Sequence, residues 1–191
     1  MFLEQFPTEG RQHGWIEVIC GSMFSGKTEE LIRRLKRVEF AQQKLVLFKP
    51  AIDDRYHEQN VVSHTGSSFT GISVAHSRDI LSQWRKEWVV AIDEAQFFDE
   101  ELPSVCDELA RQGVRVIIAG LDMDYLGKPF GPMPQLLSIA EYVTKVHAIC
   151  VSCGNLAHYS HRTTSEEGQV LVGAVESYQP LCRSCFNKIA H

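Results

Sequence analysis

Residues 16–28 read IEVICGSMFSGKT and join a short apolar run to a loop bounded by glycines. The run at residues 16–20 is rich in Ile and Val, which is typical of a buried β-strand. Residues 21–28 fit GxxxxGK[ST] at every fixed position. This motif is specific when a strand precedes it and a helix follows it, and both conditions are met here. The stretch therefore predicts a strand, a phosphate-binding loop and a helix in succession.

Each part of the loop has a chemical purpose. Its glycines let backbone N–H groups wrap a phosphate, and the helix N-terminus adds the positive end of its dipole. Lys27 would reach the β- and γ-phosphates of a nucleoside triphosphate, and the Thr28 hydroxyl would bind Mg²⁺. We assign nucleotide binding to the whole loop, which comprises Gly21, Ser22, Met23, Phe24, Ser25, Gly26, Lys27 and Thr28.

A second apolar run supplies the acidic half of such a site. Residues 89–92 are followed directly by Asp93 and Glu94. An aspartate at the end of an apolar strand is the Walker B pattern, which brings a carboxylate close to the metal ion. Glu94 could take a proton from the nucleophile that attacks the γ-phosphate. That nucleophile is water in an ATPase and a substrate hydroxyl in a kinase, and the motif leaves both open.

Strands and helices alternate through the first two thirds of the chain. Further apolar runs at residues 45–48 and 114–119 predict buried strands, and helical periodicity follows the loop and recurs at residues 101–112, closed by Gly113. This alternation predicts an α/β fold with a mostly parallel sheet. The basic residues of the first helix are assigned to a solvated face: Arg33, Arg34, Lys36 and Arg37.

The composition, the net charge and the lengths of the apolar runs argue against several classes of protein. The chain has 191 residues, 44% of them hydrophobic, with a formal net charge of −5 and a pI near 5.9. No apolar run approaches the roughly 20 residues of a membrane span, so we expect no membrane association. The N-terminal segment lacks the features of a secretory signal. The acidic balance argues against a protein whose main work is to clasp nucleic acid backbones.

Six cysteines are present, and four of them form two CxxC pairs: Cys150 with Cys153, and Cys182 with Cys185. Two such pairs predict a tetrahedral four-thiolate zinc site, which leaves no open position for catalysis and is therefore structural. A redox dithiol pair, or a histidine (His158 or His161) in place of one cysteine, remains the alternative. The polar stretch from residue 155 to 169 is expected to be a long excursion, and residues 142–149 one strand. Cys20 and Cys106 are expected to be small buried apolar residues.

Taken together, these parts resemble the cellular-type (type II) thymidine kinase family. The matching stretches are GSMFSGKT, FKPAIDDRY, DEAQFF, GLDMDYLGKPFGPM and VGAVESYQPLCRSCF, and the resemblance extends from residue 17 to residue 186. Ser22 departs from the family, which most often has proline there. This difference alters only the stiffness of the loop.

The resemblance implies roles for individual residues. Glu94 matches the general base that takes the proton of the nucleoside 5′-hydroxyl, and Asp93 matches the carboxylate on the side of the metal. Other positions expected around the phosphates and Mg²⁺ are Asp53, Arg55, Ala95 and Gln96. Residues that match those enclosing thymine and deoxyribose are Met23, Phe97, Leu121, Tyr125 and Phe130. At a loop that folds over the base, called the lasso, the pyrimidine would be held by the Tyr178 side chain and by backbone groups of Gln169, Val170, Leu171, Val172 and Gly173.

The resemblance also implies an organisation and a reaction. A flexible tail (1–14) would precede a RecA-like P-loop domain (15–143) and a zinc-binding lasso domain (144–191). The expected reaction is ATP-dependent phosphorylation of thymidine, with deoxyuridine also accepted, in DNA precursor salvage. The family is cytoplasmic, commonly tetrameric and inhibited by thymidine triphosphate. The rival reading is a P-loop ATPase whose zinc knuckle grips nucleic acid.

Overall fold

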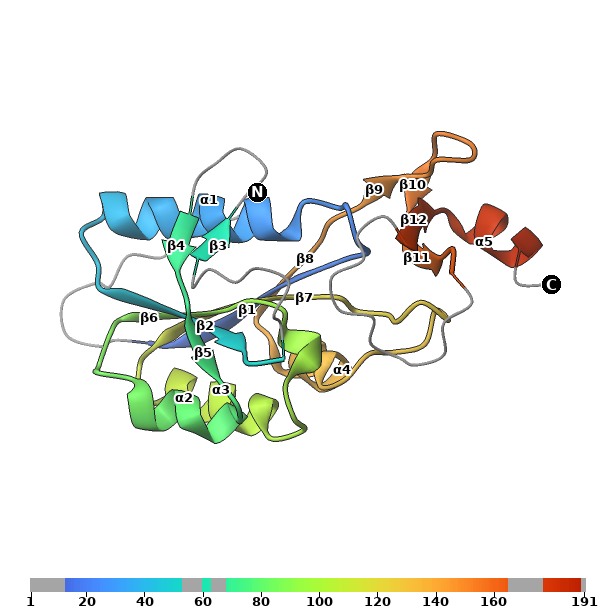
Figure 1. The fold of residues 1–191 in the computed structure, drawn as a ribbon. Helices are drawn as coiled ribbons and strands as arrows, with labels where there is room; N and C mark the ends of the chain where they lie inside the picture. Colours follow the sequence, from blue (N-terminus) through green and yellow to red (C-terminus); the bar gives the residue numbers. More distant parts are fainter. Residues whose placement is uncertain (1–12, 53–59, 63–67, 165–176, 190–191) are drawn as a thin grey trace.

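A computed structural model describes residues 13–52, 60–62, 68–164 and 177–189 (Figure 1). Its main element is a sheet of six strands with the spatial order β5-β2-β6-β7-β1-β8, in which every pairing is parallel. These strands are β1 (Trp15–Cys20), β2 (Leu45–Pro50), β5 (Ile72–Val74), β6 (Val89–Ile92), β7 (Arg115–Gly120) and β8 (Tyr142–Lys145). The predicted α/β fold with a mostly parallel sheet is confirmed.

Helices cover both faces of this sheet (Figure 1). Helix α1 (Lys27–Phe40) lies on one face, and α2 (Ser77–Gln83), α3 (Leu102–Arg111) and α4 (Met133–Ile139) lie on the other. The second predicted helix is confirmed as α3, and Gly113 just beyond it has a φ of 86°, as a helix-closing glycine does. Two short strands, β3 (Asn60–Val62) and β4 (Ser68–Thr70), form a separate antiparallel pair. Among the described residues, no helix has the length and apolar character of a membrane span.

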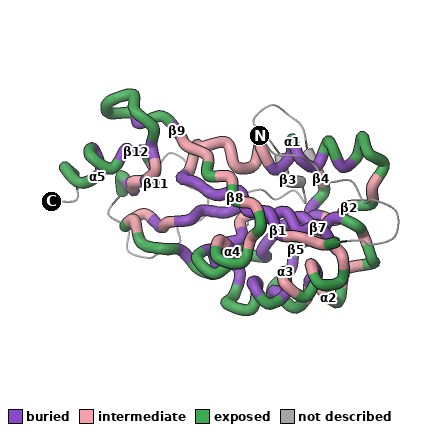
Figure 2. Tube along the Cα trace, turned by 180° about the vertical axis from the view of Figure 1, so that it is seen from behind, coloured by how far each residue is buried: buried purple, intermediate pink, exposed green. Residues whose placement is uncertain are grey.

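Two buried clusters fill the space between the sheet and its helices. Successive strand residues point to opposite faces, so Val18 joins the cluster under α3 while Ile19 joins the one under α1. Strand β7 is therefore buried along its whole length and β1 along all but its first residue, as Figure 2 shows in purple. Double-sided burial explains why these strands read as continuous apolar runs.

One basic residue of α1 differs from expectation. Arg33, Lys36 and Arg37 are exposed, but Arg34 is only 2% exposed. Its Nη1 lies 2.7 Å from Oε2 of Glu17, a residue of β1 with no exposed surface. The assignment of Arg34 to a solvated face is wrong because a buried carboxylate compensates its charge.

This buried carboxylate connects several elements. Glu17 also pairs with Arg115 of β7 at 2.7 Å and accepts a hydrogen bond from Nε1 of Trp15 at 2.6 Å. Arg34 in turn donates to Glu30 on its own helix and to Thr144 of β8. The Glu17 network thus joins α1 to three neighbouring strands of the sheet.

After Lys145 the chain leaves the sheet and forms a second lobe, the described part of residues 146–189. It contains β9 (Ala148–Ile149), β10 (Leu156–Ala157), β11 (Tyr159–Arg162), β12 (Tyr178–Leu181) and α5 (Arg183–Ile189). Strand β9 pairs with β10 and β11 with β12, both antiparallel. Figure 1 shows this lobe, in orange and red, at one end of the main sheet.

Two expectations for this part of the chain are corrected. Residues 142–149 form two strands rather than one, since the N–H of Val146 makes a last bond to the Cys20 carbonyl before the chain turns away. The polar stretch after residue 155 is not a loop throughout, because it contains β10 and β11. These strands bury Tyr159, Ser160 and Arg162. Residues 165–169 of the stretch lie outside the described part.

Cys20 and Cys106 are buried, as expected. Burial raises the pKa of the Cys20 thiol to about 11, and the nearby negative charge of Asp122 adds to this rise. Burial likewise raises the pKa of Cys106. Both side chains are therefore neutral, apolar components of the core.

Candidate active site

The phosphate-binding loop has the conformation that its sequence predicts. It connects β1 to α1, and Gly26 at the helix N-terminus has a φ of 85°, in the left-handed region that favours glycine. At Gly21 a Cβ atom would lie 2.2 Å from the carbonyl oxygen of Val146, so no side chain fits there. Both fixed glycines of the motif are therefore required by the backbone itself.

Polar side chains of the loop fold back onto it. Nζ of Lys27 donates to the Ser22 carbonyl oxygen at 2.9 Å, and Oγ of Ser25 donates to the same oxygen at 2.7 Å. Thr28 is half-buried in the first turn of α1, and Phe24 is exposed. The ammonium group of Lys27 thus lies directly over the loop, in the position from which it can meet a phosphate.

The second lobe reaches this loop. Oγ of Ser160 on β11 accepts a hydrogen bond from the N–H of Met23 at 2.9 Å, and Ser160 is only 5% exposed. Oγ of Ser22 donates to the Ala157 carbonyl oxygen at a longer 3.5 Å. Ser160 has no role that its sequence context predicts, since the residue lies in a stretch that reads as a polar loop.

Asp93 and Glu94 lie at the carboxyl end of β6. Strand β7 separates β6 from β1, and all three are parallel, so the acidic pair and the phosphate-binding loop share one edge of the sheet. Asp93 is 7% exposed, and its Oδ1 accepts a hydrogen bond from the N–H of Glu94 at 2.9 Å. Glu94 has a φ of 52°. A non-glycine residue in this left-handed region is uncommon and often marks a functional site.

Gln96 lies two residues further, in a 3₁₀ turn, η1 (Ala95–Phe97). It is 2% exposed, and Ala95 before it is completely buried. Nε2 of Gln96 donates to Oε2 of Glu94 at 2.6 Å, and its Oε1 accepts from the N–H of Leu121 at 2.8 Å. Both ends of its amide therefore bind groups of this chain.

Two of the expected thymidine contacts form an aromatic pair. The rings of Phe97 and Phe130 lie edge to face, with centroids 5.7 Å apart and an interplanar angle of 89°. Phe130 and Leu121 are buried, and Phe97 is partly exposed. Edge-to-face packing fixes the two rings relative to each other beyond what burial alone does.

Two other expected contacts meet at an arginine that the sequence analysis did not select. The guanidinium carbon of Arg162 lies 3.8 Å from the ring centroid of Tyr125. Its Nη2 donates to Oη of Tyr178 at 2.8 Å. Arg162 thus joins Tyr125, which follows β7, to Tyr178 on β12. The signal that could have found it is its position beside two tyrosines in the fold, which sequence spacing does not reveal.

Seven of the predicted positions lie outside the described residues. They are Asp53, Arg55, Gln169, Val170, Leu171, Val172 and Gly173.

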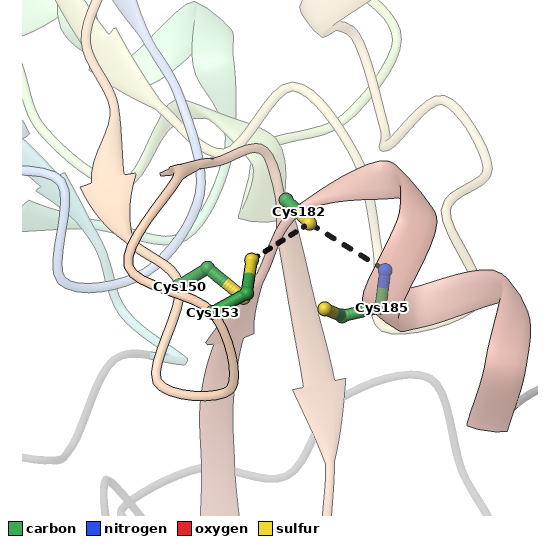
Figure 3. Close-up of side chains that lie close together, drawn as sticks. All are labelled: Cys150, Cys153, Cys182 and Cys185. Carbon is green, nitrogen blue, oxygen red and sulfur yellow. Dashed lines mark hydrogen bonds between the residues drawn. The ribbon is translucent and has the colours of Figure 1, made fainter.

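The four paired cysteines come together in the second lobe (Figure 3). Their sulfur atoms all lie within 4.8 Å of one another, and Sγ of Cys153 is 3.5 Å from Sγ of Cys182. Four thiolates around a tetrahedral zinc, with Zn–S bonds of about 2.3 Å, have similar separations of roughly 3.8 Å. The quartet could therefore hold a metal such as zinc.

Backbone groups favour the thiolate, metal-binding form of one member of this quartet, Cys150. Desolvation raises the pKa of Cys150, but hydrogen bonds from backbone N–H groups, that of Cys182 foremost, outweigh it and lower the pKa to about 6. The N–H of Cys185 points at Sγ of Cys182 at 3.5 Å. Since the thiolate is the metal ligand, donors of this kind suit a metal centre. Among the described histidines, His158 packs edge to face on His147 and belongs to no such cluster.

Comparison with solved structures supports the fold. The flagellar accessory protein FlaH from Methanocaldococcus jannaschii superposes with a TM-score of 0.50, covering 77% of this chain and 76% of its own, at 12% sequence identity. At this identity the likeness concerns the architecture alone. It agrees with the RecA-like P-loop fold expected here.

Relatives similar in sequence match nearly the whole chain. The family model described as "Thymidine kinase" matches residues 14–186. A thymidine kinase of Bacteroides thetaiotaomicron is 59% identical over 186 residues, which cover 97% of this chain and 94% of the relative. That of Rhodothermus sp. is 55% identical over 177 residues, covering 93% of this chain and 83% of the relative. The chain therefore belongs to the thymidine kinase family and is a kinase.

Proposed function

We propose that the chain transfers the γ-phosphoryl group of ATP to the 5′-hydroxyl of thymidine, giving thymidine monophosphate and ADP. The observation that carries this proposal is the shared sheet edge of the Lys27 loop and the Asp93–Glu94 pair. A phosphoryl group held by the loop would face a carboxylate able to accept the proton of an attacking hydroxyl.

Each polar group of the site has a role in this reaction. Backbone N–H groups of the loop and the Lys27 ammonium would hold the phosphates. Asp93 and the Thr28 hydroxyl would supply oxygen ligands, which suit Mg²⁺. When bound with ATP, Mg²⁺ neutralises charge on the phosphates. Glu94 would take the proton of the 5′-hydroxyl as the phosphoryl group moves.

The nucleoside is proposed to lie against the aromatic side chains. Residues proposed to enclose it are Met23, Phe97, Leu121, Tyr125, Phe130 and Tyr178, together with residues 169–173. Flat rings suit a pyrimidine, and the edge-to-face pair of Phe97 and Phe130 supports such a wall. A covered site would exclude water and so favour transfer over hydrolysis. Deoxyuridine, which lacks only a methyl group, should also be accepted.

The remaining features of the proposal rest on the family. We propose a structural zinc in the cysteine quartet, a tail (1–14), a nucleotide-binding domain (15–143) and a lasso domain (144–191). We further propose a role in DNA precursor salvage in the cytoplasm, a homotetrameric assembly, and inhibition by thymidine triphosphate. Nucleic acid is not proposed as a partner.

The decisive variant is Glu94→Gln. It keeps the size of the side chain and removes its ability to accept a proton, so kcat should fall by about 10²–10⁴-fold, the usual contribution of a general base. Binding of ATP, measured by calorimetry, should stay within about twofold of the parent chain. Undiminished turnover in this variant would show that the proton goes elsewhere.

The substrate is tested by kcat/KM for three nucleosides side by side. Deoxyuridine should remain within roughly 10–200-fold of thymidine, the range for one missing methyl group. Deoxycytidine should be poorer by up to about 10⁴-fold, since its amino group replaces a carbonyl acceptor. ATP consumption stimulated by single-stranded DNA and indifferent to thymidine would support the rival ATPase instead.

A further inference from the structure

Gln96 lies between the proposed general base and the next strand of the sheet. Its position in η1 turns its side chain back toward Glu94, while the neighbouring strand β7 ends beside it. The resemblance to the family groups Gln96 with residues around ATP and Mg²⁺. In this structure its amide makes two short hydrogen bonds within the chain, to Glu94 and to Leu121.

The two hydrogen bonds determine which way the amide faces. The N–H of Leu121 can only donate, so the atom opposite it at 2.8 Å must be the oxygen Oε1. The amide nitrogen then faces Oε2 of Glu94 at 2.6 Å, and only a donor fits there when the carboxylate is ionised. The backbone of Leu121 thus presents, through Gln96, a fixed N–H donor to one oxygen of Glu94.

The surroundings leave Gln96 little freedom. It is 2% exposed, and two glycines border it. A Cβ on Gly120 would lie 3.0 Å from Oε1 of Gln96, and a Cβ on Gly131 would lie 2.4 Å from its carbonyl oxygen. A side chain at Gly131 would collide with the Gln96 backbone, and one at Gly120 would crowd its amide oxygen. Gln96 is therefore closely packed in this position.

The backbone of Glu94 needs such support. With φ 52° and ψ 42° it occupies the left-handed region, which is costly for a residue with a side chain. Its N–H is held by the Asp93 carboxylate at 2.9 Å, and one of its carboxylate oxygens by Gln96.

We propose that Gln96 is a positioning residue that fixes the carboxylate of Glu94 by binding its Oε2. This inference rests on the proposed function of Glu94 as general base. Gln96 touches neither substrate nor metal in this account and acts only through Glu94. A carboxylate that is already held in one orientation loses less conformational entropy in the reaction than a freely rotating one does.

The test uses Gln96→Glu, which changes only the end of the side chain that faces Glu94. An oxygen remains to accept from Leu121 N–H, while the donor toward Glu94 is replaced by another oxygen. We expect kcat to fall by about 10–10²-fold, the scale of a small misplacement of a catalytic group, with KM for ATP within about twofold. Gln96→Met, of similar length, removes both hydrogen bonds and should lose at least as much. Gln135→Ala, an exposed glutamine on α4, is the matched control and should be neutral.

A double-mutant cycle distinguishes positioning from other roles. In a Glu94→Gln background, Gln96→Met should cost less than about threefold in kcat, because its only route to the reaction is already removed. An undiminished loss in that background, or a KM for ATP that rises in step with the loss of kcat, would overturn the inference and place Gln96 on the nucleotide or its metal. A Glu94→Gln variant with normal turnover would instead overturn the proposed function. Calorimetric binding of a non-hydrolysable ATP analogue confirms that each variant is folded.

Discussion

The main sheet and the second lobe are stabilised by different means. The sheet buries long apolar side chains on both faces, in two clusters that run from β2 to β1. The second lobe has one small cluster, and three of its members are cysteines of the quartet. A core of this size rarely holds a lobe in place by burial alone. The comparison teaches that apolar burial orders the first region, whereas the second has too small a core for this and, with the proposed structural zinc, would depend on the bonds of its thiolates.

The two regions nevertheless meet at the phosphate-binding loop. Ser160 of the second lobe holds the N–H of Met23, so a part of the loop depends on a strand outside the main sheet. Disorder in the second lobe should therefore weaken the binding of the nucleotide as well as that of the nucleoside.

The largest effect is expected from breaking the quartet. Replacing Cys153 and Cys182 together by serine should abolish metal binding, which is worth on the order of 10 kcal/mol in structural zinc sites. Metal analysis should fall from one zinc per chain to none, and amide exchange should become fast in β9–β12 while β1 and β7 stay protected. Cys106→Ala, outside the quartet, is the control and should keep its zinc. Full zinc content in the double variant would contradict the assignment.

A smaller effect, confined to the other region, is expected from Glu17→Gln. It leaves Arg34 and Arg115 buried without their shared carboxylate, which typically costs about 3–5 kcal/mol. Denaturant unfolding of the main sheet should show this loss, with the zinc content unchanged.

Asp107→Asn gives the matched control for that measurement. It breaks an exposed ion pair with Arg111 and should cost less than about 1 kcal/mol. Equal losses in the two variants would mean that burial of the Glu17 network adds nothing to the stability of the sheet.

The smallest effect is expected at the contact between the regions. Ser160→Ala leaves the N–H of Met23 without its acceptor, a defect of about 1–3 kcal/mol. Part of this should appear as weaker ATP binding, up to about tenfold by calorimetry, with zinc retained. Ser138→Ala, an exposed serine on α4, should bind as the parent chain does. Equal affinities of the two variants for ATP would show that nucleotide binding by the loop does not depend on its contact with the lobe.

Much of the first region could be predicted from the sequence because its signals are local. The apolar run Val89–Ile92 predicts a strand from four neighbouring residues. The loop ending in Lys27 and Thr28 predicts a turn followed by a helix in the same local way. The cysteine quartet is local in the same sense, since each pair forms its own turn. The helical periodicity after the loop also agrees with the buried face of α1, which includes Leu31 and Leu35.

What could not be predicted depends on partners far away in the chain. Arg34 reads as a surface residue because its partner Glu17 lies on another element, and Arg162 reads as part of a loop because its two tyrosines are distant. The resemblance to the family selected Gln96, but its hydrogen bonds to Glu94 and to the backbone N–H of Leu121 could be identified only in the fold. Periodicity shows which face of a helix or strand a residue occupies, but not which charged group or hydrogen-bond donor lies opposite it in the fold.

The Glu17 network also bears on how the chain is made. Both sheet neighbours of β1, namely β7 and β8, come much later in the sequence, and Arg115 follows Glu17 by 98 residues. During synthesis the apolar strand at residues 16–20 therefore has two unpaired edges until most of the chain has been synthesised, a state that invites aggregation. A single carboxylate in the middle of such a strand is the kind of gatekeeper that opposes self-association. The charge that the finished sheet neutralises would thus keep the nascent chain soluble.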